Sequence, residues 1–236
     1  MAKVIYLVGE KFAEFFSNNG VMSVNEFISL HQKSSRFPGV TYRIGQGVTS
    51  EEICKIGEIL SRDATTVTLP ARENKAFVHK KEEQNVVITK PLLCDQNKYR
   101  AFLMLDSRCA EMSDHITGQH IQGMVIIEAA RQMMLSVTEN YLAPKEQQGK
   151  IWIILNEMSV KFFSFLFPIE VQIEYLTEES ENKENKSKYI ASVNFYQNGK
   201  LAATIKITFS VYENEKLSQN EKKLAKKALE MIGETV

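Results

Sequence analysis

One stretch of the sequence is apolar on nearly every side of the helix that it predicts. From about residue 121 to residue 141, apolar residues recur without the polar stripe that a surface helix usually carries. They are Ile121, Met124, Val125, Ile126, Ile127, Ala129, Ala130, Met133, Met134, Leu135 and Val137. Such a helix must be buried on almost all sides, so we expect it at the centre of a domain.

Strand-like segments lie on both sides of this helix along the chain. They are residues 86–89 and 99–105 before it, and 151–162, 169–176, 189–196 and 201–212 after it. We expect a bend near Asn156, a solvated loop at 178–188 and a hairpin turn at Asn198-Gly199. A single curved antiparallel sheet folded around one long helix fits this order. The pattern therefore predicts the α+β hot-dog architecture.

The first 62 residues predict a separate, small α/β unit. A buried strand at 3–8 is followed by helical stretches, a brief strand at 41–44 and a turn at 45–47. Thr49 and Glu52 form a capping box that begins another helix. The predicted divisions are 1–62 for the N-terminal unit, 63–76 for a linker, 77–213 for the hot-dog domain and 214–236 for a C-terminal amphipathic helix.

Composition and charge exclude several classes of protein. Lys plus Arg and Asp plus Glu both number 29, so no net field attracts nucleic acid. The cysteines, Cys54, Cys94 and Cys109, have no C-x-x-C spacing, which argues against a disulfide framework and a zinc site. No apolar run is long enough to span a membrane. We expect a cytoplasmic protein with no metal, cofactor, nucleic-acid partner or membrane span.

Three polar residues interrupt the apolar helix on one side. Glu128, Arg131 and Gln132 are spaced i, i+3 and i+4. Because an unpaired buried carboxylate is costly, Glu128 must pair with Arg131, be protonated with a raised pKa, or face a cavity. The pattern is compatible both with an intrahelical or dimer-interface salt bridge and with an active-site acid.

The segment that carries these residues resembles the signature of a known family. Residues 114–132 read Asp-His-Ile-Thr-Gly-Gln-His-Ile-Gln-Gly-Met-Val-Ile-Ile-Glu-Ala-Ala-Arg-Gln. This is similar to the A-factor biosynthesis (AfsA-type) hot-dog family, which carries Asp-His, a second His, Pro-Gly-Met, an apolar run and Glu-Ala-Ala-Arg-Gln. The resemblance covers roughly residues 77–212, with weaker similarity at 78–80, 85–88 and 160–168.

The resemblance implies chemistry on an acyl thioester carried by acyl carrier protein or coenzyme A. Members of the family are taken to transfer a β-ketoacyl group to dihydroxyacetone phosphate, and the wider superfamily includes 3-hydroxyacyl dehydratases and thioesterases. We expect an enzyme acting on a β-ketoacyl or β-hydroxyacyl thioester in fatty-acid-like, secondary-metabolite or signal biosynthesis. Transfer, dehydration and hydrolysis all stay open. The alternative is a non-catalytic acyl-chain or signal-binding module whose N-terminal unit docks a partner or regulates binding.

The candidate site residues fall into a catalytic and a substrate-binding group. Histidine and a carboxylate can transfer protons, and a glycine at a helix start lets a carbonyl approach free backbone amides. The catalytic candidates are Glu128, His120 and His115, and the substrate-binding candidates are Gly123, Met124, Arg131 and Gln132. Arg131 and Gln132 would also orient Glu128.

The single copy of the motif predicts a homodimer. AfsA-type proteins usually carry two hot-dog repeats, whereas this chain has one repeat after a dissimilar N-terminal unit. In a dimer, the helix of one subunit and the loop of the other would complete each site.

Overall fold

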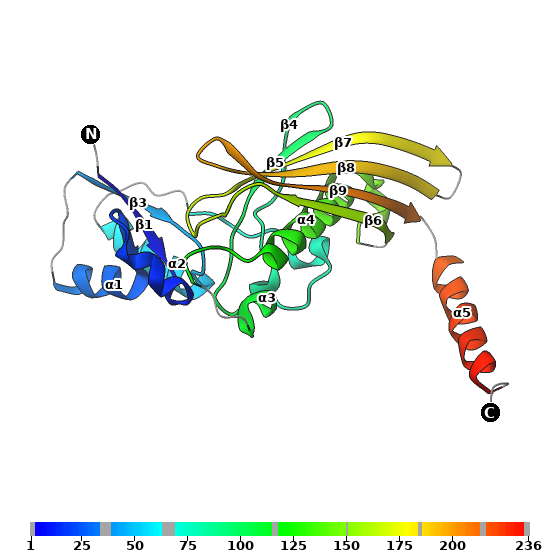
Figure 1. The fold of residues 1–236 in the computed structure, drawn as a ribbon, viewed down its shortest axis with the longest axis horizontal. Coiled ribbons are helices and arrows are strands. Elements are labelled where there is room, and N and C mark those ends of the chain that lie inside the picture. The colour runs from blue at the N-terminus through cyan, green and yellow to red at the C-terminus, as the bar shows by residue number, and fades with distance from the viewer. Residues whose placement is uncertain are drawn as a thin grey trace.

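The computed structural model describes residues 3–33, 39–62, 69–114, 118–149, 151–183, 186–212 and 216–233. These residues form a small N-terminal unit, a larger unit beside it, and a helix that extends from the far end of the larger unit (Figure 1). In the larger unit, a six-stranded antiparallel sheet covers one long helix. The predicted hot-dog architecture is confirmed.

The six strands of the main sheet lie in the order β4-β5-β7-β8-β9-β6. Their bounds are β4 Leu92–Asp95, β5 Lys98–Phe102, β6 Trp152–Phe162, β7 Gln172–Lys183, β8 Lys186–Gln197 and β9 Lys200–Tyr212. The register of β6 shifts between Leu155 and Glu157, where the sequence predicts a bend. Asn198 and Gly199 both have positive φ, as a two-residue type I′ hairpin turn requires.

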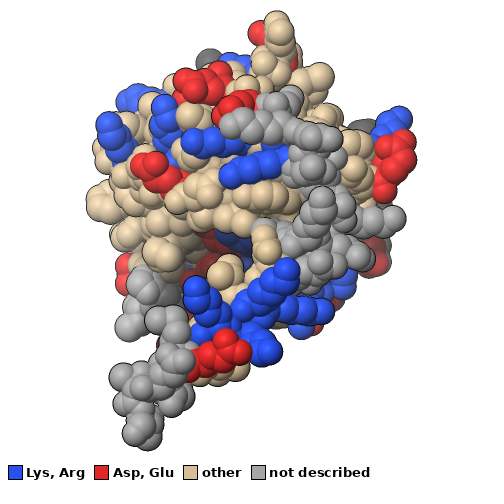
Figure 2. Space-filling model, turned by 90° about the vertical axis from the view of Figure 1, so that its right-hand side faces the viewer, with Lys and Arg blue, Asp and Glu red and all other residues tan. Residues whose placement is uncertain are grey.

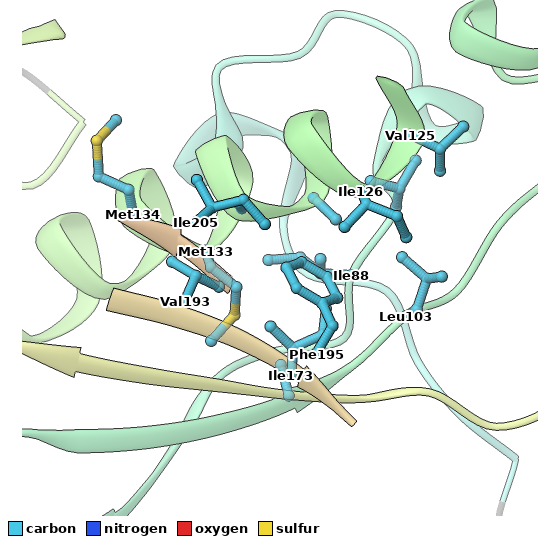
Figure 3. Packing of buried hydrophobic residues seen from close by; sticks show 14 of the residues in the cluster. Ile88, Leu103, Val125, Ile126, Met133, Met134, Ile173, Val193, Phe195 and Ile205 are labelled. Atoms are coloured by element: carbon cyan, nitrogen blue, oxygen red, sulfur yellow. The ribbon is translucent and has the colours of Figure 1, made fainter. Parts of the chain in front are cut away.

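The long helix α4 (Gly123–Val137) packs beneath the sheet, and a π-helical turn at Thr138–Leu142 continues it. Its apolar side chains contact sheet residues such as Phe195 and Ile205 (Figure 3). Each fully buried large apolar side chain contributes about 1.5–3 kcal/mol. The sheet lies on one side of α4, while residues 75–87 and the short helix α3 (Ala110–Ser113) cover others.

Two parts of the main unit differ from the sequence prediction. The predicted loop at 178–188 is wrong, because β7 and β8 stay paired as far as Lys183 and Lys186. This end of the hairpin extends past α4 (Figure 1), so neither face is covered by the helix and its polar residues show no alternation. The predicted strand at 86–89 is reduced to isolated bridges, one from Thr89 to Arg72 and one from Ile88 to Leu103.

The N-terminal unit is built on a three-stranded parallel sheet with the order β2-β1-β3. Its elements are β1 Lys3–Val8, a 3₁₀ helix Glu10–Ser17, β2 Val21–Ser23, α1 Val24–Lys33, β3 Val40–Ile44 and α2 Ser50–Arg62. The predicted capping box is present. Glu52 N donates to Thr49 Oγ1 at 3.2 Å, and Thr49 N donates to Glu52 Oε2 at 2.8 Å.

Gln46 joins the two units. Its side chain is buried, and Nε2 donates to the carbonyls of Leu103 and Ile169 at 3.1 and 3.2 Å. Its Oε1 accepts a hydrogen bond from the amide of Leu105 at 2.9 Å. The backbone amide of Gln46 donates to the carbonyl of Pro168 at 3.0 Å. One residue in the turn at 45–47 therefore bonds to two separate segments of the hot-dog unit.

The apolar cores of the two units interlock. Val8, Phe12 and Phe15 from the N-terminal unit belong to the core of the hot-dog unit. Met104 from the hot-dog unit packs in the opposite direction, into the core of the N-terminal unit. The N-terminal unit is therefore a structural part of this molecule and not a tethered appendage.

We predict that Gln46→Ala lowers the free energy of unfolding by about 3 kcal/mol, because three buried backbone groups lose their partner. Urea unfolding followed by circular dichroism measures the change. Gln96→Ala, at an exposed position in the β4–β5 turn, is the matched control and should change it by less than about 0.5 kcal/mol. Equal effects from the two substitutions would contradict the joining role of Gln46.

Candidate functional site

A pocket of about 600 Å³ opens at the N-terminus of α4. The loop before α4, its first turn and the segment that follows β6 line it. The lining residues are His120, Ile121, Gly123, Ile126, Phe162, Phe163, Ser164, Phe165 and Leu166. Most of them are aromatic or aliphatic, as in sites that bind apolar ligands.

The first turn of α4 forms one wall of this pocket. Gln122 is the N-cap residue, and its side chain makes no capping hydrogen bond. Amides in the first turn of a helix carry partial positive charge and can donate to a developing oxyanion. A Cβ atom at Gly123 would lie 3.1 Å from Cζ of Phe162, so glycine leaves this space free. A carbonyl group could therefore approach the helix start closely.

His120 lies on the exposed side of the pocket. The centre of its ring is 4.7 Å from the centre of the Phe165 ring. Met124, in the first turn of α4, is 66% exposed and does not line the pocket. The other candidate histidine, His115, lies outside the described residues.

Glu128 lies in an ion cluster. Arg131 Nε and Nη2 donate to its two carboxylate oxygens at 2.7 and 2.8 Å, and Gln132 Nε2 donates to Oε1 at 2.9 Å. Lys80 Nζ is 2.9 Å from Glu128 Oε1 and 2.9 Å from Oε1 of Glu111. The carboxylates of Glu111 and Glu128 and the cationic groups of Lys80 and Arg131 thus balance one another's charge on one side of α4.

This cluster determines the protonation of Glu128. Partial burial acts to raise the pKa of the carboxyl group, but the hydrogen bonds from Arg131, Gln132 and Lys80 outweigh it, and the pKa is lowered from its usual value. The sequence leaves three possibilities open for Glu128, and in the structure its carboxylate is paired with Arg131. The raised pKa considered for an acid at this position is therefore wrong.

Gln132 connects the cluster to neighbouring segments. Its side chain is fully buried, its Oε1 accepts from the Val87 amide at 2.9 Å, and its Nε2 also donates to the Asn85 carbonyl at 2.7 Å. Asn85 Oδ1 in turn accepts from the amide of Ala110, the first residue of α3, at 2.8 Å. Gln132 therefore positions Glu128 and does not reach the solvent or the pocket.

The structure separates the candidate residues into two groups. His120 and Gly123 lie at the pocket, whereas Glu128 and its partners lie on another side of the helix. Five positions along a helix correspond to a rotation of about 140°, which accounts for the separation of Glu128 from Gly123. The partner Lys80 is not a predicted site residue. Its only sequence signal is its place in the weak resemblance at 78–80.

A second buried carboxylate lies near the other end of the long helix. Glu139, in the π-helical turn, accepts from the Gly149 amide at 2.6 Å and lies 3.2 Å from Nε2 of His79. Its side chain is fully buried, whereas the side chain of His79 is 40% exposed. Neither residue is among the predicted site residues, although an acidic residue at the end of an apolar helix is a usable signal.

Other chemistry is limited in the described part of the chain. No group of three or more His, Cys, Asp or Glu side chains among the described residues could hold a metal ion. Burial raises the pKa of the Cys109 thiol to about 11, which suppresses its reactive thiolate form. None of the helices in the described ranges is both long and apolar enough to cross a membrane.

Residues 63–213 match the family described as the A-factor biosynthesis hotdog domain. The chain belongs to this family. The matched region of this AfsA-family chain includes the whole main sheet, α4, the pocket and the ion cluster, but not residues 1–62. The resemblance of the 114–132 segment is thereby confirmed. No curated protein matches the chain.

Several solved structures match part of this chain at low identity. A mutant thioesterase from Pseudomonas aeruginosa is 14% identical, with 54% of this chain and 82% of that chain covered and a TM-score of 0.39. A thioesterase from Haemophilus influenzae is 12% identical (55% and 80%, TM-score 0.39), and AziG from S. sahachiroi is 12% identical (54% and 92%, TM-score 0.39).

We predict that Glu128 makes stability depend on pH in the acidic range. Its lowered pKa stabilises the fold above the usual carboxyl pKa of 4.5, and this contribution is lost as the pH falls through the lower native value. The free energy of unfolding of Glu128→Gln should therefore be lower than that of the wild type near neutral pH, and the difference should shrink below about pH 4.5. Urea titrations at a series of pH values measure it.

The control for this prediction is Glu82→Gln, which removes a carboxylate from an exposed position close to Lys80 in sequence. The stabilising role of the cluster would be contradicted if the free energy of unfolding of Glu128→Gln stayed below that of the wild type by a constant amount down to pH 2.5. The same loss of stability in the control would also contradict it.

Proposed function

We propose that this AfsA-family protein acts on an acyl thioester whose acyl chain occupies the pocket at the N-terminus of α4. The observation that carries this proposal is the pocket itself, an apolar space of about 600 Å³ that ends at the first turn of a helix. An apolar wall suits an acyl chain, and helix-start amides suit the thioester carbonyl. The thioester would be carried by acyl carrier protein or coenzyme A.

In this proposal, the carbonyl oxygen lies against the first-turn amides of α4 at Gly123. These amides stabilise negative charge on the oxygen without any reorganisation, and removing one donor at such a site costs about 10²–10³-fold in rate. His120 exchanges the proton with the reacting group or with water. Transfer, dehydration and hydrolysis of a thioester all use a polarised carbonyl, so this arrangement suits each of them.

Glu128 supports the site indirectly in this proposal. Its ionised carboxylate ties α4 to Lys80, and Gln132 ties the same turn to the backbone at 85–87. These bonds hold the helix and therefore hold its first turn at the pocket. Glu128 and Gln132 are positioning residues, whereas His120 and Gly123 would touch the substrate.

A second function, acyl binding without turnover, is favoured by one specific observation. Among the described residues, His120 is the one titratable side chain that lines the pocket. General acid–base chemistry on a thioester usually needs a second group to orient the first. A module that binds an acyl chain needs no such group, and the N-terminal unit would then dock a partner or regulate binding.

We predict that acyl carrier protein loaded with a β-ketoacyl or a β-hydroxyacyl chain changes mass when incubated with the protein. Intact-mass spectrometry, with and without dihydroxyacetone phosphate, distinguishes the reactions: loss of water indicates dehydration, loss of the acyl group hydrolysis, and acceptor-dependent loss transfer. His120→Gln should slow the change at least 100-fold, in line with the usual contribution of general acid–base catalysis. The matched control His31→Gln, in α1 of the N-terminal unit, should leave it within about twofold.

Retention of an unchanged acyl chain over hours would support the binding module and contradict the enzyme. Neither turnover nor retention, with coenzyme A thioesters as well, would contradict the acyl-thioester proposal as a whole.

We also propose that the chain forms a homodimer through β6. This strand is at the edge of the sheet and has 11 residues, and its exposed apolar side chains include Trp152, Leu155 and Phe162. A long apolar edge strand exposes unpaired backbone groups that favour pairing with another strand. Pairing with the same strand of a second copy would satisfy these groups symmetrically.

Charge favours one antiparallel register for this pairing. With the two-fold axis at Ser159, Glu157 of each copy lies opposite the partner's Lys161 on the outer face. On the face toward α4, Met158 lies opposite the partner's Val160. Opposite charges and apolar pairs at facing positions each contribute roughly 0.2–1 kcal/mol. This register uses the regular part of β6 beyond the shift at Leu155/Glu157.

We predict that Glu157→Lys weakens the dimer at least tenfold, because it places two like-charge pairs across the interface. The combined variant Glu157→Lys/Lys161→Glu exchanges the two charges and should restore the wild-type dissociation constant to within about threefold. Sedimentation equilibrium measures the constant for each variant. A monomeric wild type would contradict the dimer, and a combined variant no better than the single one would contradict this register.

A further inference from the structure

The C-terminal helix α5 (Lys216–Gly233) has an apolar face with no partner in the described chain. Every α5 side chain that the structure describes, from 220 to 230, is exposed. Leu224 is 67% exposed and Leu229 is 71% exposed. With 100° per residue, Leu224, Ala225, Ala228 and Leu229 fall on one side of the helix and its lysines on the other. A helix with this pattern needs a surface to cover.

The lysine side of α5 faces outward. Figure 2 views the molecule from the α5 end, and blue side chains gather over the helix in the lower part of this view. Figure 1 shows α5 leaving the end of β9 on the side of the sheet that α4 occupies. The side of the sheet that carries the pocket is therefore the side toward which α5 extends.

A second uncovered apolar surface surrounds the pocket. Phe162, Phe163 and Phe165 are 53%, 57% and 67% exposed, which is unusual for phenylalanine. They lie at the end of β6 opposite to the end at which α5 begins, because Trp152 pairs with Tyr212 and Phe162 pairs with Ala203. Within one chain, the apolar face of α5 and the aromatic surface therefore belong to opposite ends of the sheet.

In the proposed dimer, the α5 end of one copy lies beside the aromatic surface of the other copy. In the antiparallel pairing about Ser159, Asn156 lies opposite the partner's Phe162, and the Trp152 end of β6 lies next to the partner's pocket segment. Tyr212 is one strand away from Trp152, so it lies about 10 Å from the partner's Leu166, which this register places opposite Trp152. α5 has 18 residues and is therefore about 27 Å long, long enough to cross the partner's pocket.

The area of the interface also favours α5 of the second copy as the cover of the pocket. In this register residues 156–162 pair with the same residues of the partner, a strip roughly 23 Å long and 10 Å high, or about 230 Å² per copy. This is less than a third of the about 800 Å² per partner in a stable interface. Each α5 adds a strip of about 270 Å², and in a symmetric dimer each copy both gives one helix and receives one. Two reciprocal helices supply the missing area.

We propose that α5 of each copy lies over the partner's pocket, with its leucines on the partner's Phe162, Phe163 and Phe165 and its lysines toward solvent. This inference rests on the proposed dimer and on the pocket of the proposed function. Each acyl site is then incomplete in one chain alone, because its cover comes from the second copy. Covering the pocket removes water from the acyl chain and leaves a basic surface above the site.

The test is crosslinking between two differently tagged variants in a Cys54→Ser/Cys94→Ser background. One chain carries Leu224→Cys and the other Phe165→Cys, and the heterodimer is purified through both tags. A short bis-maleimide should join most of the heterodimer into a species of two-chain mass. Lys226→Cys, two residues further along α5 and on its opposite side, is the matched control and should crosslink to Phe165→Cys at least tenfold less.

Equal crosslinking from Leu224→Cys and Lys226→Cys, or none from either, would overturn the proposal. A single chain carrying both Leu224→Cys and Phe165→Cys must crosslink between chains, and an intrachain product would also overturn it. Light scattering on the same samples separates the failures. A dimer without crosslinks refutes the position of α5 alone, whereas a monomer refutes the dimer as well. Neither readout depends on acyl turnover.

Discussion

The burial of α4 on nearly all sides is the constraint on which the rest of this structure depends. A helix without a free solvent face must satisfy its polar side chains with protein groups. Glu128 and Gln132 therefore need Lys80 and the backbone at 85–87, and Asn85 extends the same bonds to α3. These bonds hold residues 80–87 and α3 against the helix. The sheet covers what these segments leave open.

The same burial leaves open space at one end of the helix. Along most of α4, side chains fill the space between helix and sheet. At its first turn, Gly123 has no side chain, and the segment after β6 leaves a pocket beside it. Free amides and free space therefore coincide at the helix start. The ion cluster lies on another side of the helix.

The sequence predicts those parts of the fold that a local run of residues determines. The apolar run of α4, the bend of β6 and the turn at Asn198-Gly199 each have a local cause, and each is present. The extended β7–β8 hairpin has polar residues on both faces, so periodicity could not reveal it. At the site, Glu128 and Arg131 are recognisable by their spacing. Lys80 is not, because it lies 48 positions earlier and only the fold brings it to Glu128.

The bonds of Gln46 also concern the order in which the protein is synthesised. Gln46 leaves the ribosome well before Pro168 and Ile169, to which it is bonded in the finished protein. At about 5–20 residues per second, the intervening residues take roughly 6–24 seconds to translate. For that time, Phe12, Phe15 and the amide of Gln46 lack their final partners. A nascent chain of this protein therefore keeps this apolar surface exposed until β4, β5 and β6 and the segment that follows them have emerged.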